Sequence, residues 1–211
     1  MASTSWSYLQ AGSCTSGAVL PALAVIVLNW EVLDIASMLH LWRIATIRMC
    51  ADGGSNRVFD LAHRHGQASA LVPDTIVGDL DSIRSEVRTF YAERGSEIIH
   101  RPDQDHHDLH KCLAVLSERQ AEELGDGGGR RLTVLVVGAL DGRLDQQMAN
   151  LNMGYRWWTS FEQILFASRH SLAVVLHPGV VHCLAPASGF EGYPVESFIG
   201  APPTTSKSVF A

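Results

Sequence analysis

Short runs of apolar and β-branched residues recur along the first two thirds of the chain. The run Leu23–Leu28 is continuously apolar, which is typical of a strand buried on both faces. Four further runs have strand length and a similar composition: Ile47–Ala51, Thr75–Val77, Glu97–His100 and Leu132–Val137. The pattern predicts five strands.

Segments with helical spacing of apolar residues lie between these runs and after the last one. They are Ile35–Trp42, Asn56–His65, Ser82–Arg94, Asp105–Leu124 and Leu144–Trp158. Strand and helix therefore alternate, and crossover helices of this kind connect parallel strands. We expect an α/β domain over residues 18–158, with a doubly wound, mostly parallel, Rossmann-like sheet covered on both faces.

The pattern changes at both ends of this domain. Residues 1–17 are rich in Ser, Thr, Ala and Gly without periodicity, and we expect a flexible tail there. After Trp158 the strand-like pieces Ile164–Phe166, Ser171–Leu176 and Val180–Leu184 follow without a helix between them. We interpret residues 159–211 as a partial all-β sandwich domain.

Composition narrows the possible partners and compartments. The chain has 211 residues and a formal net charge of −6, so it lacks the basic excess that binds a phosphate backbone, and we expect no nucleic acid. The apolar stretch Ala18–Leu28 is about half of the roughly 20 residues that span a bilayer. No charged signal segment is evident, and the four cysteines form no CxxC pair. We therefore expect a cytoplasmic protein with no membrane partner.

Acidic residues follow the predicted strands. In parallel sheets, ligands bind beyond the carboxyl ends of the strands. The acids at these ends are Asp52, Asp79, Asp81, Asp105, Asp108 and Asp145. So many carboxylates at one edge would repel each other unless a cation lies among them, and oxygen ligands suit Mg²⁺.

Asp79 and Asp81 are the first choice as Mg²⁺ ligands, because alternate residues of extended backbone point to one side. The alternative is that they form a turn or cap the following helix. Asp105 and Asp108 fit a variant capping box, and such acids could also bind metal-bridged phosphate or accept a proton from a hydroxyl.

Basic residues near these acids suggest phosphate binding. Arg143 has a guanidinium that matches phosphate oxygens, and Lys111 is a weaker candidate. His106 and His110 are four residues apart on a predicted helix, which could bind zinc, but the flanking aspartates favour a harder cation.

The motifs resemble those of the thiamine pyrophosphokinase family. The segments that carry the resemblance are Asp52-Gly-Gly-Ser-Asn-Arg57, Gly78-Asp-Leu-Asp-Ser82, Pro102-Asp-Gln-Asp-His-His-Asp108 with Lys111-Cys112, and Gly142-Arg-Leu-Asp-Gln146. They occur in the family's order and spacing, and the likeness covers about residues 24–152.

The resemblance implies a homodimeric, magnesium-dependent enzyme that transfers pyrophosphate from ATP to thiamine, giving thiamine diphosphate and AMP. It implies catalytic roles for Asp79, Asp81, Asp105, Asp108 and Arg143, with Asp79, Asp81 and Asp105 as metal ligands. The implied nucleotide- and substrate-binding residues are Asp52, Asn56, Ser82, Gln104, Lys111, Asp145 and Gln146.

The chain also departs from the family. The family usually has Thr where His107 stands and often has Thr at the position of His110. Asp141 replaces a common glycine, which adds strain if this position needs a positive φ. The β-domain, which supplies much of the thiamine pocket in the family, is shorter here. The alternative function is therefore a catalytically weak or silent nucleotide-binding isoform that dimerises with a full-length enzyme.

Overall fold

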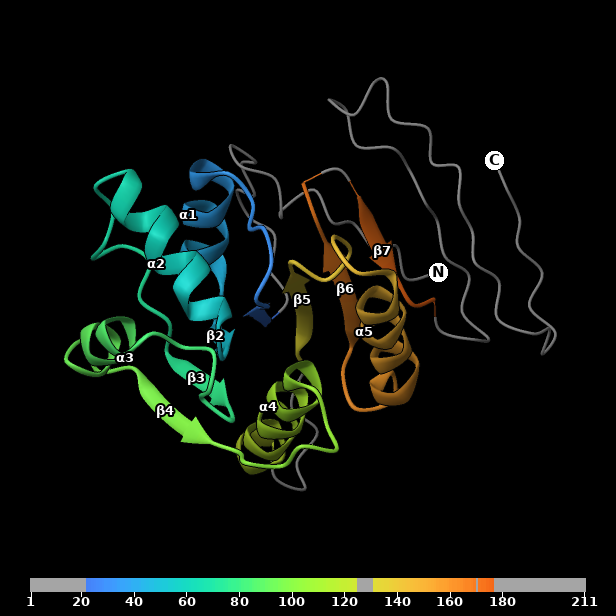
Figure 1. Ribbon diagram of the computed structural model, residues 1–211. Coiled ribbons are helices and arrows are strands. Elements are labelled where there is room, and N and C mark those ends of the chain that lie inside the picture. The colour runs from blue at the N-terminus through green and yellow to red at the C-terminus, as the bar shows by residue number, and fades with distance from the viewer. Residues whose placement is uncertain (1–21, 125–130, 170, 177–211) are drawn as a thin grey trace, which may run out of the picture.

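One sheet forms the centre of the computed structural model, which describes residues 22–124, 131–169 and 171–176 (Figure 1). Its strand order is β4-β3-β2-β1-β5-β6-β7. The strands are β1 (Leu23–Val27), β2 (Ile47–Ala51), β3 (Thr75–Gly78), β4 (Glu97–His100), β5 (Thr133–Val137), β6 (Gln163–Ala167) and β7 (Leu172–Val174). The helices are α1 (Ile35–Ile44), α2 (Gly54–Arg64), α3 (Ser85–Ala92), α4 (Asp108–Leu124) and α5 (Leu144–Trp157).

The strands β1 to β6 are parallel, and β7 pairs antiparallel with β6. From β1 the chain builds outward through β2 and β3 to β4, and α4 then returns it to β5 on the other side of β1. The direction of winding reverses between β1 and β5, where Val27 pairs with Val137. Such a reversal leaves a crevice at the carboxyl ends of the two strands.

Helices cover both faces of the sheet, as the α/β pattern predicts. In Figure 1, α1, α2 and α3 lie on one side, and α4 and α5 lie on the other. Alternate residues of β1 enter the two cores: Val25 and Val27 join side chains of α1 to α3, whereas Ala24 and Ile26 join those of α4 and α5. Burial on both faces explains why the strands are continuously apolar.

The sheet continues past the expected domain boundary at residue 158. β6 pairs with β5 along its whole length, from Thr133 with Gln163 to Val137 with Ala167, and β7 continues the same sheet. A buried parallel strand and a sandwich strand have similar sequences, so the pattern alone could not separate them. The remaining expectations for the ends, namely the tail at 1–17, the strand at 180–184 and an all-β domain, lie outside the described residues.

The helix that follows β4 begins later than expected. It starts at Asp108, and the amides of His110 and Lys111 donate to the carbonyl of His107. Asp105 is therefore not the N-cap residue of α4, and it lies in the preceding loop. None of the helices in the described part of the chain has the length and apolar character needed to cross a bilayer.

Candidate functional site

Asp52 lies directly after β2 and is 1% exposed. Its backbone has φ 40°, a conformation that non-glycine residues seldom adopt and that aspartate tolerates better than most. Its carboxylate accepts hydrogen bonds from the amides of Ser82, at 3.1 Å, and Ile83, at 3.0 Å. These bonds tie the end of β2 to the loop after β3.

Asp79 and Asp81 follow β3, which ends at Gly78. They come together in a turn, because Leu80 between them has φ 65° and the amide of Asp81 donates to Asp79 Oδ1 at 3.4 Å. The backbone is therefore not extended here, contrary to our expectation, but the carboxylates of Asp79 and Asp81 still lie close together. Left-handed backbone at a leucine is strained, and strain of this kind occurs at functional sites.

The three acids form one candidate metal site. Asp52, Asp79 and Asp81 each offer a carboxylate oxygen, and these atoms lie within 4.8 Å of one another. Oxygen-only ligands of this charge fit Mg²⁺ better than zinc or copper. The third acid of this group is Asp52, whereas we expected Asp105 as the third metal ligand.

Glycines allow the backbones around this site to approach closely. A Cβ at Gly78 would lie 2.6 Å from the Cβ of Asp52, and a Cβ at Gly54 would lie 2.2 Å from the carbonyl oxygen of Val27. At Gly53 it would lie 3.1 Å from the Cβ of Ser82. The Asp-Gly-Gly motif therefore packs the start of α2 against β1 and brings Asp52 beside the loop after β3.

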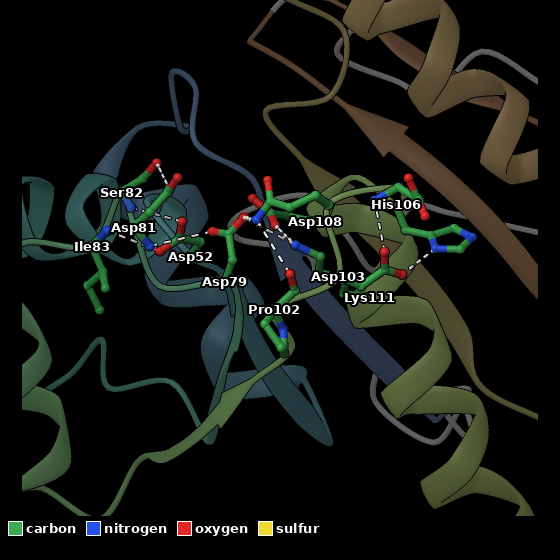
Figure 2. Close-up of polar contacts among 12 residues, drawn as sticks. Asp52, Asp79, Asp81, Ser82, Ile83, Pro102, Asp103, His106, Asp108 and Lys111 are labelled. Atoms are coloured by element: carbon green, nitrogen blue, oxygen red, sulfur yellow. Dashed lines mark hydrogen bonds and ion pairs between the residues drawn. The ribbon is translucent and has the colours of Figure 1, made fainter.

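Lys111 is the cation of the site (Figure 2). Its side chain is 4% exposed, and its Nζ lies 3.4 Å from Asp79 Oδ2 and 3.3 Å from Asp108 Oδ1. Gln104 also donates to Asp79 Oδ2, at 3.1 Å. One lysine thus links α4 to the end of β3, and the carboxylates still outnumber it.

Burial and neighbouring charges shift the pKa values of the site. Burial, opposed by the two amide hydrogen bonds and reinforced by Asp108, raises the pKa of Asp52 to about 6. Burial also raises the pKa of Asp108, although Lys111 offsets part of this effect. For Asp79, burial is outweighed by the Asp81 amide and Lys111, so its pKa is lowered. Asp108 and Asp79 outweigh burial at Lys111 and raise its pKa.

Asp105 and His106 bond to Asp103, within the loop that precedes α4. The amide of Asp105 donates to Asp103 Oδ1 at 2.8 Å, and the carboxylate of Asp103 bonds to His106. Figure 2 shows Asp103 and His106 directed away from Asp52 and Asp81. His106 precedes α4 and stacks on His110 with ring centroids 4.1 Å apart. Burial lowers the pKa of His107, which favours its neutral imidazole.

Arg143, Asp145 and Gln146 are exposed at the start of α5. The Arg143 guanidinium donates to both carboxylate oxygens of Asp145, through Nε at 3.0 Å and Nη2 at 2.5 Å, and the two side chains are 70% and 64% exposed. No contact in the described chain joins this pair to the three acids. Positive φ occurs at Gly142, not at Asp141, so the expected strain at Asp141 is absent.

Asn56 organises the neighbouring loop from the first turn of α2. Its Nδ2 donates to the carbonyl of Ser82 at 2.8 Å, and its Oδ1 accepts from the amide of Arg84 at 3.0 Å. Ser82 in turn donates its hydroxyl to Asp81 Oδ1 at 2.8 Å. Both residues therefore hold the loop that carries Asp81.

The site also involves the end of β1, where no site residue was expected. Asn29 accepts a hydrogen bond from Arg57 Nε at 3.0 Å, and its side chain contacts Gly53. Trp30 follows it and lies against Gly142. The rule that ligands bind at strand ends, applied to Leu23–Leu28, would have found both residues.

Fold and site together define a parallel α/β domain with an acidic edge, whose carboxylate oxygens are of the kind that hold a hard cation. The family model described as thiamin pyrophosphokinase, catalytic domain, matches residues 38–166. Thiamine pyrophosphokinase 1 of Oryza sativa subsp. japonica is 42% identical over 146 residues, which is 64% of this chain and 52% of that protein. Thiamine pyrophosphokinase 1 of Arabidopsis thaliana is 38% identical over 142 residues, covering 64% and 51%.

A solved structure, thiamin pyrophosphokinase from Candida albicans, has the same fold. Its TM-score is 0.63 at 23% identity, and the match covers 72% of this chain and 60% of that one. This chain belongs to the thiamine pyrophosphokinase family, because the catalytic-domain model matches more than half of it. It spans about half the length of the relatives named above.

Proposed function

We propose that this protein is a thiamine diphosphokinase that transfers the pyrophosphoryl group of ATP to thiamine. The observation that carries the proposal is the group formed by Asp52, Asp79 and Asp81 beside Lys111, within the region that matches the catalytic domain. In the proposed reaction the thiamine hydroxyl oxygen bonds to the β-phosphorus of ATP. The bond from that phosphorus to the oxygen of the α-phosphate breaks, and AMP leaves.

We assign a separate role in this reaction to each residue of the site. Asp52, Asp79 and Asp81 would hold Mg²⁺, which neutralises phosphate charge when it is bound. Lys111 contributes to the lowered pKa of Asp79 and adds a second positive charge near the phosphates. We assign to Asp108, whose pKa burial raises, the role of accepting the hydroxyl proton. Positioning and charge neutralisation supply most of the catalysis of such transfers.

Arg143 remains a proposed phosphate ligand. Its present partner, Asp145, is exposed, so exchanging this partner for a phosphate oxygen costs little desolvation. Gln104, Asn56 and Ser82 position acids or the loop that carries them. We also propose a homodimer and a cytoplasmic location; the two described cysteines, Cys50 and Cys112, are free and buried.

The proposal is tested by measuring thiamine diphosphate and AMP formation from thiamine and magnesium ATP by the purified full chain. We expect turnover that EDTA abolishes. Asp81→Asn removes one proposed ligand and should lower turnover more than about 100-fold. Glu118→Gln, an exposed acid on α4 paired with Arg101, is the matched control and should leave turnover unchanged.

Two other outcomes would contradict this function. Equal activity of Asp81→Asn and the wild type would remove the metal site from the mechanism. Tight binding of magnesium ATP without thiamine diphosphate formation would favour the silent nucleotide-binding isoform.

A further inference from the structure

Trp30 is an exposed aromatic side chain at the point where the sheet reverses its winding. β1 ends at Val27, and the amide of Leu28 still donates to the carbonyl of Val137 on β5, at 3.0 Å. The amide of Trp30 then donates back to the carbonyl of Leu28 at 2.8 Å. Trp30 therefore belongs to a tight turn at the crevice between β1 and β5. Its side chain is nevertheless 39% exposed.

Contacts on both sides hold this turn in place. Asn29 contacts Gly53 and bonds to Arg57, and Gly53 in turn adjoins Ser82, the neighbour of Asp81. On the other side, a Cβ at Gly142 would lie 2.5 Å from Cζ2 of the Trp30 indole. Only a glycine at position 142 lets the indole lie this close to the loop that carries Arg143.

Trp30 consequently lies between the two parts of the site that otherwise make no contact. On one side, the turn contacts Gly53, which lies beside Ser82 and so beside the three acids. On the other side, it contacts Gly142, which directly precedes the Arg143–Asp145 pair. A ligand with phosphates at the acids and further groups toward α5 would pass over the indole. The other large exposed aromatic side chain of the described chain, Tyr155, lies near the far end of α5.

We propose that Trp30 is the stacking platform for the base of the nucleoside triphosphate. This inference rests on the proposed function, since it takes the phosphates to be bound at Asp52, Asp79 and Asp81. An indole offers a flat apolar surface at low conformational cost, and stacking on it does not depend on hydrogen-bonding groups of the base. The closely fitted Gly142 keeps the ring oriented before the ligand arrives.

The test compares two magnesium complexes that differ only in whether they carry a nucleoside. Isothermal titration of the full chain measures the Kd of magnesium ATP and of magnesium tripolyphosphate. Trp30→Leu should raise the Kd for ATP about tenfold, because one stacked base contributes about 1–3 kcal/mol. Trp30→Phe keeps a ring and should change it less than about threefold. Neither variant should change the Kd for tripolyphosphate.

Tyr155→Leu removes an aromatic ring of similar exposure outside the site and serves as the matched control. Its Kd for ATP should equal that of the wild type, and circular dichroism verifies that each variant is folded.

Three results would overturn the inference while leaving the proposed function intact. Trp30→Leu could bind ATP as the wild type does, could weaken ATP and tripolyphosphate equally, or could weaken thiamine instead of ATP. Wild-type protein that binds neither magnesium complex would contradict the proposed function itself, and the inference with it.

Discussion

At the scale of single residues, the folded state holds Asp52 in an unfavourable backbone conformation and a buried environment. It combines left-handed backbone with a carboxylate that is 1% exposed, and two amide hydrogen bonds compensate only part of the lost hydration. A buried carboxylate next to Asp79 and Asp108 favours its protonated form, which raises its pKa to about 6. A bound cation would relieve this cost, so we expect metal binding at Asp52 to stabilise the folded protein.

The first prediction concerns the pH dependence of stability without metal. The pKa of Asp52 is raised from 3.8 in the unfolded chain to about 6, so the folded state holds the proton more tightly. The tighter binding of this proton adds to the free energy of unfolding at low pH, below the pKa of the unfolded chain, and this addition is lost as the pH rises through 6. Urea unfolding in EDTA should show the wild type losing about 2 kcal/mol relative to Asp52→Asn between pH 4 and pH 7.

Comparing the two proteins across this pH range separates the titration of the Asp52 carboxyl from any loss of stability that the substitution causes at every pH. Asn places an amide nitrogen against one of the two backbone N–H donors, which shifts the stability equally at every pH. A constant difference between the two proteins across this range would show that the Asp52 carboxyl has an ordinary pKa. Added Mg²⁺ at pH 7 should stabilise the wild type more than the variant.

The second prediction concerns Lys111. Lys111→Met leaves Asp79 and Asp108 without their counter-ion, and because both acids are partly exposed we expect a loss of about 2 kcal/mol at pH 7 in EDTA. Mg²⁺ should restore part of the loss by supplying positive charge at the same place. Chemical unfolding with and without Mg²⁺ measures both effects, and equal losses in the two conditions would contradict the electrostatic explanation.

At the scale of elements, the connection from β2 to α2 positions the site. Gly53 and Gly54 allow the helix to start directly against the end of β1, and Gly53 supplies no side-chain cap. α2 is therefore stabilised by packing of Val58, Leu61 and Ala62 more than by its own terminus. The close approach brings Asp52 under the loop after β3.

The third prediction concerns the close approach of α2 to β1. Gly54→Ala would place a Cβ 2.2 Å from the carbonyl oxygen of Val27, a backbone atom that cannot rotate away. We expect a loss of about 2–4 kcal/mol in the free energy of unfolding and weaker Mg²⁺ binding. Gly66→Ala has open space around its Cβ and should cost about 1 kcal/mol through its φ of 65° alone. Thermal or urea unfolding that shows equal losses for the two variants would contradict the steric explanation.

At the scale of the whole molecule, the parallel topology gathers distant residues at one edge. Asp52, Asp79 and Lys111 belong to different strand–helix units, and each unit contributes through the residues that follow its strand. The sheet also extends further than the expected domain. β6 is buried along its length and pairs with β5 inside the sheet.

The fourth prediction follows from the place of β6. Phe166 is fully buried among side chains of α4 and α5, so Phe166→Ala should destabilise the main cooperative transition by about 3–5 kcal/mol. Leu172 on β7 is half exposed, and Leu172→Ala should cost less than about 1 kcal/mol. Calorimetry that shows an unchanged main transition for Phe166→Ala would mean that β6 folds as part of a separate unit.

Periodicity along the sequence was enough to predict the elements and the class of fold. Strand and helix positions agree closely with those observed, from Leu23–Val27 to Leu144–Trp157, because continuous apolar strands and amphipathic helices each leave a local pattern. The acids at the strand ends were predictable for the same reason. Parallel strands must place those ends on one edge.

Tertiary structure alone decided which of these acids meet and where the sheet ends. Asp52 rather than Asp105 completes the group with Asp79 and Asp81, because the left-handed turns at Asp52 and Leu80 and the contact of Gly78 with Asp52 depend on packing between units. The same holds for Trp30 beside Gly142 and for β6 beside β5. Contacts between residues far apart in the chain leave no periodic trace in the sequence, so only the folded molecule reveals them.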